Sequence, residues 1–282
     1  MPRVIIVGCG FLGEAAADLF FQSGWNVLGI CAGAESARRL APKPYEVRAV
    51  DIRATFSLAA PWRNADALVH CAAPDRADAD KYRLVYFEGL KNALLGVQPH
   101  RVLFTGSTSV YAQTDGQWVD EASETTPTRE TGRILLEAEA AALAAGGFVA
   151  RLSGLYGPGR SVLMQKFLSG EATIEGDGQR WINQIHRDDA ARAIIHLLTK
   201  PVPAGVYNVS DNTPAHQITV YRWLADHFGH ALPGGGQPDL NRKRGWTSKR
   251  VSNLKLRQAG WIPAFPAYRD AISSLGAGCI CP

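Results

Sequence analysis

Residues 3–21 read RVIIVGCGFLGEAAADLFF, and this stretch decides the fold. A short apolar run leads into the pattern G-x-G-x-x-G at Gly8, Gly10 and Gly13, and an alanine-rich helical pattern follows. Gly8 permits a tight turn, Gly10 lets a pyrophosphate approach the backbone, and Gly13 lets the helix pack closely on the strand. The helix then offers unpaired N–H groups and its positive dipole end to phosphates. The stretch therefore predicts a nucleotide site that includes Phe11 and Leu12.

The bulk composition is that of an ordinary globular protein. The chain has 282 residues, 46% hydrophobic and 20% charged, which is enough for a substantial core. The formal net charge is +4 without a long basic run, so no nucleic-acid partner is expected. No apolar stretch reaches the ~20 residues that span a bilayer. The first strand pattern starts at Arg3, so neither a membrane segment nor a signal peptide is expected.

Cysteine usage favours a reduced, cytoplasmic protein, because none of the five cysteines has zinc spacing. Three of them lie in or beside apolar runs and are expected to be small buried residues, namely Cys9, Cys31 and Cys71. The other two, Cys279 and Cys281, lie in a glycine-rich tail.

Strand and helix patterns alternate along the first half of the chain. Strand patterns occur at residues 3–7, 25–30, 46–51, 67–73, 101–105 and 147–152. Helical patterns lie between them, at 13–22, 34–40, 80–96 and 131–145. Strands joined by helical crossovers predict an α/β fold with a Rossmann-type doubly wound parallel sheet. Ligands of such a sheet bind outside the carboxyl ends of its strands.

After residue 155 glycine and proline become frequent and the pattern loosens, which predicts a smaller C-terminal substrate lobe. We expect a dinucleotide-binding domain at 1–154, to which residues 185–211 return, and a substrate lobe formed by 155–184 and 212–282.

Five stretches resemble the short-chain dehydrogenase/reductase superfamily, and more narrowly its extended NAD-dependent epimerase/dehydratase family. They are Gly8–Gly13, FTGSTSVY at 104–111, RLSGLYGPGR at 151–160, IHRDDAARA at 185–193 and VYNVS at 206–210. The resemblance implies an NAD(P) cofactor, and a small-molecule substrate held in the cleft between the lobes. It also implies that Asp51 and Ile52 flank the adenine, and that Ala72 and Ala73 belong to the cofactor site.

The catalytic residues that the family implies are mostly replaced. The family uses a Tyr general acid/base, a Lys four residues later, a Ser that polarises the substrate carbonyl and an Asn. Ser107 occupies the Ser position, whereas Thr131, Leu135 and Tyr86 stand at the Tyr, Lys and Asn positions. A Thr hydroxyl does not titrate near neutrality and Leu carries no charge, so the usual proton relay is absent. The pattern resembles the atypical members of the superfamily.

Two tyrosines are candidates to replace the missing acid. Tyr111 follows the loop beside Ser107 and can donate a proton, or it packs beneath the substrate. Tyr86 lies on the helix that faces this loop, and the alternative is a core aromatic whose hydroxyl is satisfied. Ser107 itself either binds a substrate carbonyl or caps its own turn.

Further residues are expected on the substrate side. They are Ser109, Tyr156, Arg160 and Arg133, the last either holding an anionic group or lying on the helix surface. His186 is expected to hold structure, with Asp188 or Asp189 capping the next helix. A basic patch near Trp246 is either a solvated face or a site for an anionic substrate, and it comprises Lys243, Arg244, Lys249 and Arg250.

The second strand pattern favours NADP over NAD. It ends without the acidic residue that binds a ribose 2′-hydroxyl, and small residues followed by Arg38 and Arg39 leave room for a 2′-phosphate. The two arginines are alternatively ordinary surface charges.

The leading hypothesis is an NAD(P)-dependent oxidoreductase or epimerase acting on a small, anionic or neutral molecule. The alternatives are a non-catalytic, redox-responsive dinucleotide-binding protein and a vestigial cofactor site beside a cofactor-free isomerase. The sequence leaves a homodimer open, formed through helices 80–96 and 131–145.

Overall fold

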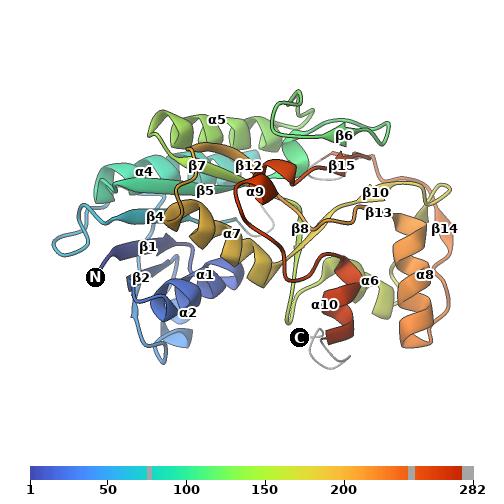
Figure 1. The fold of residues 1–282 in the computed structure, drawn as a ribbon, viewed down its shortest axis with the longest axis horizontal. Helices are drawn as coiled ribbons and strands as arrows, with labels where there is room; N and C mark the ends of the chain where they lie inside the picture. The colour runs from blue at the N-terminus through green and yellow to red at the C-terminus, as the bar shows by residue number, and fades with distance from the viewer. Residues whose placement is uncertain (75–77, 241–244, 275–282) are drawn as a thin grey trace.

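A seven-stranded parallel sheet forms the centre of the molecule (Figure 1). Six of its strands are those that the sequence pattern predicts, and Gly205–Val209 adds a seventh. The computed structural model describes residues 1–74, 78–240 and 245–274, so Lys243, Arg244, Cys279 and Cys281 lie outside the described residues. The strand order is β12-β7-β5-β4-β1-β2-β3, with parallel pairing throughout. The bounds are β1 Arg3–Val7, β2 Asn26–Cys31, β3 Glu46–Ala49, β4 Ala67–His70, β5 Arg101–Ser107, β7 Phe148–Leu152 and β12 Gly205–Val209.

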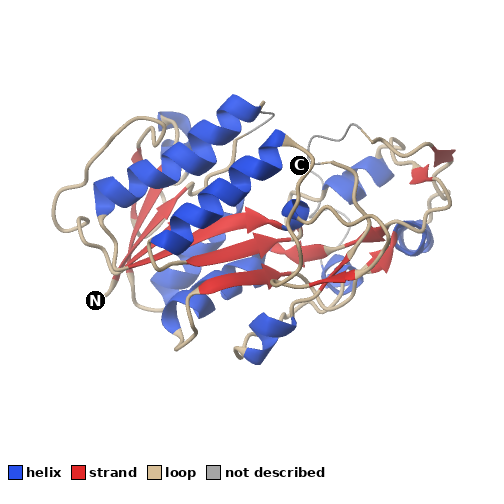
Figure 2. Ribbon diagram, turned by 90° about the horizontal axis from the view of Figure 1, so that it is seen from above, coloured by secondary structure: helices blue, strands red, loops and turns tan. Residues whose placement is uncertain are grey.

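Helices cover both faces of this sheet, because successive strand residues point to opposite sides. In β1, Val4 and Ile6 pack in one core cluster and Ile5 and Val7 in another. The first face is covered by α1 (Phe11–Gln22), α2 (Ala34–Arg39) and α7 (Arg187–Thr199). The second is covered by α3 (Ala79–Tyr82), the π-helix η1 (Arg83–Glu88), α4 (Gly89–Val97) and α5 (Glu130–Ala144). Figure 2 shows the helices lying along the strands.

The remaining elements are short, and one group of them forms a third core cluster beyond the carboxyl ends of the strands (Figure 1). The helices are η2 Thr108–Val110, α6 Val162–Leu168, α8 Gln217–Phe228, α9 Leu254–Gln258 and α10 Tyr268–Ser274. The strands are β6 Trp118–Val119, β8 Gly154–Tyr156, β9 Ile174–Glu175, β10 Trp181–Ile182, β11 Gln184–His186, β13 Ala215–His216, β14 Gly235–Gly236 and β15 Arg250–Val251. No helix among the described residues is long and apolar enough to cross a bilayer.

A buried ion pair ties α5 to the sheet. The Arg151 guanidinium on β7 donates to both carboxylate oxygens of Glu139, at 2.7 and 3.1 Å. It also donates to the Tyr111 hydroxyl at 2.9 Å, and that hydroxyl donates to Asn208 Oδ1 on β12 at 2.9 Å. Glu139 and Arg151 are 3% and 5% exposed. Burial outweighs the neighbouring Arg151 and raises the pKa of Glu139.

Replacing the cation of this pair is expected to destabilise the fold strongly. Arg151→Leu leaves the Glu139 carboxylate buried without a partner, which costs about 3–5 kcal/mol of unfolding free energy. Because protonation removes the buried charge, the loss relative to wild type is expected to shrink as pH falls towards 5. Urea unfolding of both proteins at pH 5 and pH 8 measures it.

The control is Arg53→Leu, which breaks the exposed Arg53–Asp51 pair and is expected to change stability far less. Equal losses in the two variants would contradict a special role for the buried pair.

Candidate active site

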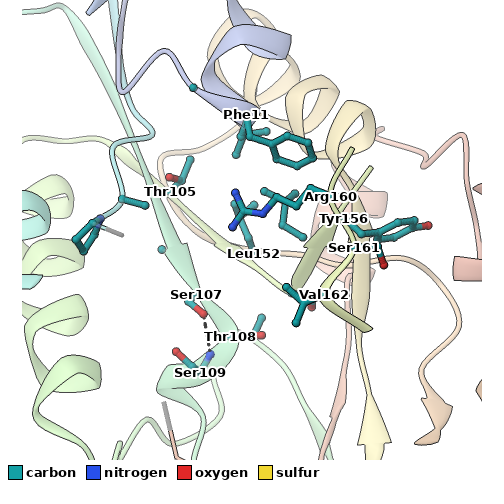
Figure 3. Close-up of a pocket in the computed structure, with 18 of the residues that line it drawn as sticks. Phe11, Thr105, Ser107, Thr108, Ser109, Leu152, Tyr156, Arg160, Ser161 and Val162 are labelled. Carbon is teal, nitrogen blue, oxygen red and sulfur yellow. Dashed lines mark hydrogen bonds between the residues drawn. The ribbon is translucent and has the colours of Figure 1, made fainter. Parts of the chain in front are cut away.

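One large cavity extends from the carboxyl edge of the sheet to the short elements around the third core cluster. Its volume is about 1290 Å³, and its lining comes from the ends of β1, β2, β4, β5 and β7 and from α6 and α8 (Figure 3). The position agrees with the general rule for ligand sites of open parallel sheets. Every residue expected in the cofactor site lines this cavity except Gly13 and Arg38.

The glycine loop is built so that nothing but backbone fits where it turns. Gly8 has φ +85°, and a Cβ there would lie 2.3 Å from the backbone of Ala72 on the neighbouring strand end. A Cβ at Gly13 would lie 2.2 Å from the carbonyl oxygen of Gly8. Gly10 precedes α1 and has open space around it, which is the room that an approaching pyrophosphate requires. The loop therefore fits a dinucleotide.

At the end of β2 the cavity wall is small and basic rather than acidic. Ala32, Ser36 and Arg39 line it, whereas Arg38 is exposed outside the lining. The Arg39 guanidinium is 58% exposed and lies 3.1 Å from the Glu14 carboxylate. No acidic residue stands at the strand end itself, where an NAD-type site places one.

Asp51 and Ile52 line the cavity beside this wall. Arg53 holds the Asp51 carboxylate through two side-chain hydrogen bonds of 2.8 Å, and these lower the pKa of Asp51. Ala72 and Ala73, which follow β4, line the cavity as well.

Ser107 ends β5 and lines the middle of the cavity, where its hydroxyl accepts the backbone N–H of Ser109 at 3.2 Å (Figure 3). Ser107 therefore caps η2, as one of its two interpretations expects, and it also lines the cavity. The Ser109 hydroxyl is buried on the cavity wall without a hydrogen-bond partner among the described residues. A substrate oxygen would satisfy this hydroxyl.

The two candidate tyrosines occupy different environments. Tyr86 lies in the π-helix η1, is 5% exposed and lines the cavity. Tyr111 is fully buried, lies outside the lining, and its hydroxyl is bound by Arg151 and Asn208. Its burial raises the pKa of the phenol further. The geometry therefore favours Tyr86 over Tyr111 as a proton donor.

The two residues that the sequence analysis places at the family's Tyr and Lys positions do not line the cavity. Thr131 and Leu135 are 8% and 1% exposed, and neither belongs to the lining. Leu135 packs in the core cluster that also contains Tyr111 and Val110. Leu135 thus contributes to packing of the core.

The expected substrate residues separate in the same way. Tyr156 and Arg160 line the cavity, and the Arg160 guanidinium lies 5.1 Å from the Phe11 ring centroid (Figure 3). Arg133 is exposed, pairs with Glu130 at 2.9 Å and does not line the cavity, which agrees with the surface alternative.

His186 holds structure, since its Nδ1 accepts the Asp188 N–H and its ring packs on Tyr156. The expected cap was assigned to the wrong residue: His186 itself caps α7, and the Asp189 carboxylate instead accepts the N–H groups of Ala264 and Phe265.

Three charged residues complete the far wall, and the sequence did not single out two of them. Glu175 and Arg180 line the cavity together with Lys249, which is only 5% exposed. Arg250 points elsewhere and stacks between Trp118 and Trp181, at 5.1 and 5.0 Å. Trp246 donates to Glu175 at 3.0 Å. The basic patch is therefore not one solvated face in its described part, and the polar turn at 176–180 was the overlooked signal.

Comparisons with known proteins establish the family. The model of the NAD-dependent epimerase/dehydratase family matches residues 4–210, so the chain belongs to this family. The Escherichia coli K12 protein YeeZ is 32% identical over 231 residues, which are 77% of this chain and 79% of that protein.

Solved structures show the same fold over nearly the whole chain. A protein from Methylobacillus flagellatus, provisionally described as an NAD-dependent epimerase/dehydratase, is 31% identical with a TM-score of 0.76, covering 97% of both chains. The UDP-glucuronic acid 4-epimerase of Bacillus cereus, solved with UDP-glucuronic acid and NAD, is 18% identical with a TM-score of 0.79, covering 96% of both chains.

The open space at Gly10 gives a direct test of the loop. Gly10→Ala is expected to fold with unchanged stability, because a Cβ meets nothing within 4 Å, but to bind nicotinamide dinucleotides at least about tenfold more weakly because the methyl group occupies the pyrophosphate's approach. Fluorescence titration and thermal unfolding measure the two effects.

Gly33→Ala is the matched control, since Gly33 also precedes a helix, has open space around it and lies outside the cavity lining. It should leave both stability and binding unchanged. Undiminished binding by Gly10→Ala would argue against the glycine loop as the pyrophosphate site.

Proposed function

We propose that the protein is an NADP(H)-dependent oxidoreductase or epimerase that acts on a small anionic molecule. One observation carries this proposal: a single cavity runs from the glycine loop, past Ser107 and Tyr86, to the charged wall at Arg180 and Lys249. A bound nicotinamide would supply hydride transfer. The absence of the family's Tyr and Lys from the cavity supports an atypical active site.

Each polar group along this cavity has a role in the proposal. Ser107 binds the reacting substrate oxygen through its hydroxyl, and Ser109 adds a second hydrogen bond. Tyr86 gives the proton to that oxygen during reduction and accepts it during oxidation. Its placement in a π-helix supports this role, because π-helical turns occur frequently at functional sites. Tyr156 and Arg160 contact the substrate from the opposite side.

Ser36 and Arg39 would hold the 2′-phosphate that distinguishes NADP from NAD. Titration of the purified protein with NADPH and NADH is expected to show micromolar binding of NADPH and weaker binding of NADH. Arg39→Ala should weaken NADPH binding about tenfold and leave NADH binding unchanged, because a charge-assisted hydrogen bond contributes about 1.5–3 kcal/mol.

The control is Arg38→Ala, since Arg38 is exposed and outside the lining. Binding of neither nucleotide would overturn the proposed function. Equal affinities that Arg39→Ala leaves unchanged would overturn the NADP preference alone.

The catalytic assignment is tested by two tyrosine variants. With a carbonyl substrate found by screening NADPH oxidation, Tyr86→Phe is expected to lower kcat about 10²-fold or more, because it removes the proton donor. Tyr111→Phe should lower stability, since it breaks hydrogen bonds to Arg151 and Asn208, while kcat changes little. Ser107→Ala should lower kcat without changing NADPH affinity. The reverse pattern between the tyrosines would refute the assignment.

A non-catalytic, redox-responsive dinucleotide-binding protein is the second candidate, supported by the burial of Thr131 and Leu135 away from the cavity. It predicts tight NADPH binding without hydride exchange to any substrate. Under either function we propose a cytoplasmic protein with the lobes divided at residues 154, 184 and 211, and a homodimer through the helices at 80–96 and 131–145.

A further inference from the structure

One buried and one partly buried cation line the same cavity at its far wall. The Arg180 side chain is 19% exposed and Lys249 is 5% exposed, and both line the cavity. Long cationic side chains are rarely buried unless a carboxylate compensates them. The surroundings of the two cations therefore indicate what the wall is built to bind.

The two segments that carry these cations are fixed side by side. The Trp181 N–H donates to the Ser248 hydroxyl at 3.2 Å, and the Asn183 side-chain amide donates to the Lys249 carbonyl at 2.8 Å. The Arg250 guanidinium lies over the Trp181 ring, and the centroid of that ring lies 3.8 Å from the centroid of the tilted His216 ring. These contacts hold the segment of Arg180 and the segment of Lys249 next to each other on the same wall.

The carboxylate in this wall serves only one of the two cations. Glu175 Oε2 lies 3.3 Å from Arg180 Nε and also accepts the Trp246 indole N–H at 3.0 Å. Lys249 Nζ donates to the Thr247 hydroxyl at 2.8 Å and forms no ion pair with a carboxylate within the described ranges. With both cations charged, the three side chains would carry one uncompensated positive charge.

Burial, and then the repulsion from Arg180, lower the pKa of Lys249 to about 7. Burial likewise lowers the pKa of Arg180. The other titratable groups that line the cavity from the surrounding elements are Tyr156, Arg160, Lys166, Glu171, Tyr221 and Asp239. Lys166 is exposed, so it is a natural comparison for Lys249.

We propose that Arg180 and Lys249 together bind an oxyanionic group of the substrate, a carboxylate or a phosphate, and that Lys249 takes up a proton when this group binds. The anion supplies the negatively charged partner that Lys249 lacks among the described residues, and it stabilises the charged form of the amine. This inference deepens the proposed function and rests on it only in taking the bound group to be part of the substrate.

Protonation of Lys249 and binding of the anion favour each other, which fixes the direction of the pH dependence. Above about pH 7 the free protein holds Lys249 largely neutral, so binding must bring a proton from solution and affinity falls as pH rises. Below that pH the amine is already charged, and binding takes up little. An arginine at this position would stay charged throughout.

Sulfate is a suitable probe because its charge is constant between pH 6 and pH 9. Isothermal titration of the intact chain, without nucleotide and in two buffers of different ionisation enthalpy, measures affinity and proton uptake together. We expect affinity to fall at least about tenfold from pH 6 to pH 9, and uptake to rise from near zero towards one proton. Acetate, titrated in parallel, distinguishes a carboxylate subsite from a phosphate-like one by which anion binds more tightly.

Three variants isolate Lys249. Lys249→Met should bind sulfate at least about tenfold more weakly at pH 6, and Lys249→Arg should keep binding at pH 9 without proton uptake. Lys166→Met, on the same cavity but exposed, should behave as wild type. Sulfate bound at the glycine loop cancels in the difference between wild type and Lys249→Met, and circular dichroism confirms that each variant is folded.

The inference is overturned if wild-type affinity is equal at pH 6 and pH 9, if Lys249→Met binds as wild type, or if Lys249→Arg retains the full pH dependence. NADPH titration of the same preparations separates this result from the proposed function. NADPH binding with no Lys249-dependent sulfate binding refutes the subsite alone, and the converse refutes the cofactor assignment alone.

Discussion

The hydrogen bonds of the buried Arg151 guanidinium are the interaction on which the arrangement of the sheet and α5 depends. It lies on β7 and joins Glu139 of α5 to Tyr111 after η2, and Tyr111 passes the connection to Asn208 on β12. Four segments that are distant in sequence are thereby fixed around the carboxyl end of β5. Because the Arg151 guanidinium is hydrogen-bonded to the Glu139 carboxylate and to the Tyr111 hydroxyl, its charge is buried together with its counter-charge. Ser107 lies at the end of β5, where the strand pairs with β7 directly beside Arg151.

The sites around Arg151 and Arg180 differ in how many positive charges share one carboxylate. Arg151 has a carboxylate that receives three of its hydrogen bonds, so its charge is balanced inside the protein. Arg180 shares its carboxylate with Trp246, and Lys249 beside it has only a hydroxyl partner. Removing one partner of the buried Arg151–Glu139 pair would leave an uncompensated charge, whereas Lys249 already has no carboxylate partner among the described residues. The Arg151–Glu139 pair joins α5 to β7, and Arg180 and Lys249 line the cavity.

The strand and helix pattern predicted the parallel sheet correctly, since the six expected strands lie within about two residues of those observed except at the carboxyl end of the fourth, which stops at His70 rather than at residue 73. The glycine loop was equally predictable, because its spacing encodes a turn, a close approach and a helix start in consecutive residues. Tyr86 and Tyr111 could not be separated this way. The sequence predicts both near Ser107, Tyr111 from the same loop and Tyr86 from the helix that faces it. Only the hydrogen-bond partners of the Tyr111 hydroxyl and the lining of the cavity distinguish them.

The sequence by itself determined the class of fold and the cofactor loop, because both depend on local properties: apolar periodicity, backbone freedom at glycine and the order of consecutive elements. Only the tertiary structure determined which residues form the far wall of the cavity. Glu175, Arg180 and Lys249 are separated by up to 74 residues along the chain, and their burial on one wall is set by the packing of loops with no periodic pattern. The residue type determines that a lysine can carry a positive charge. Whether it is protonated near neutral pH depends on the neighbours that folding places around it.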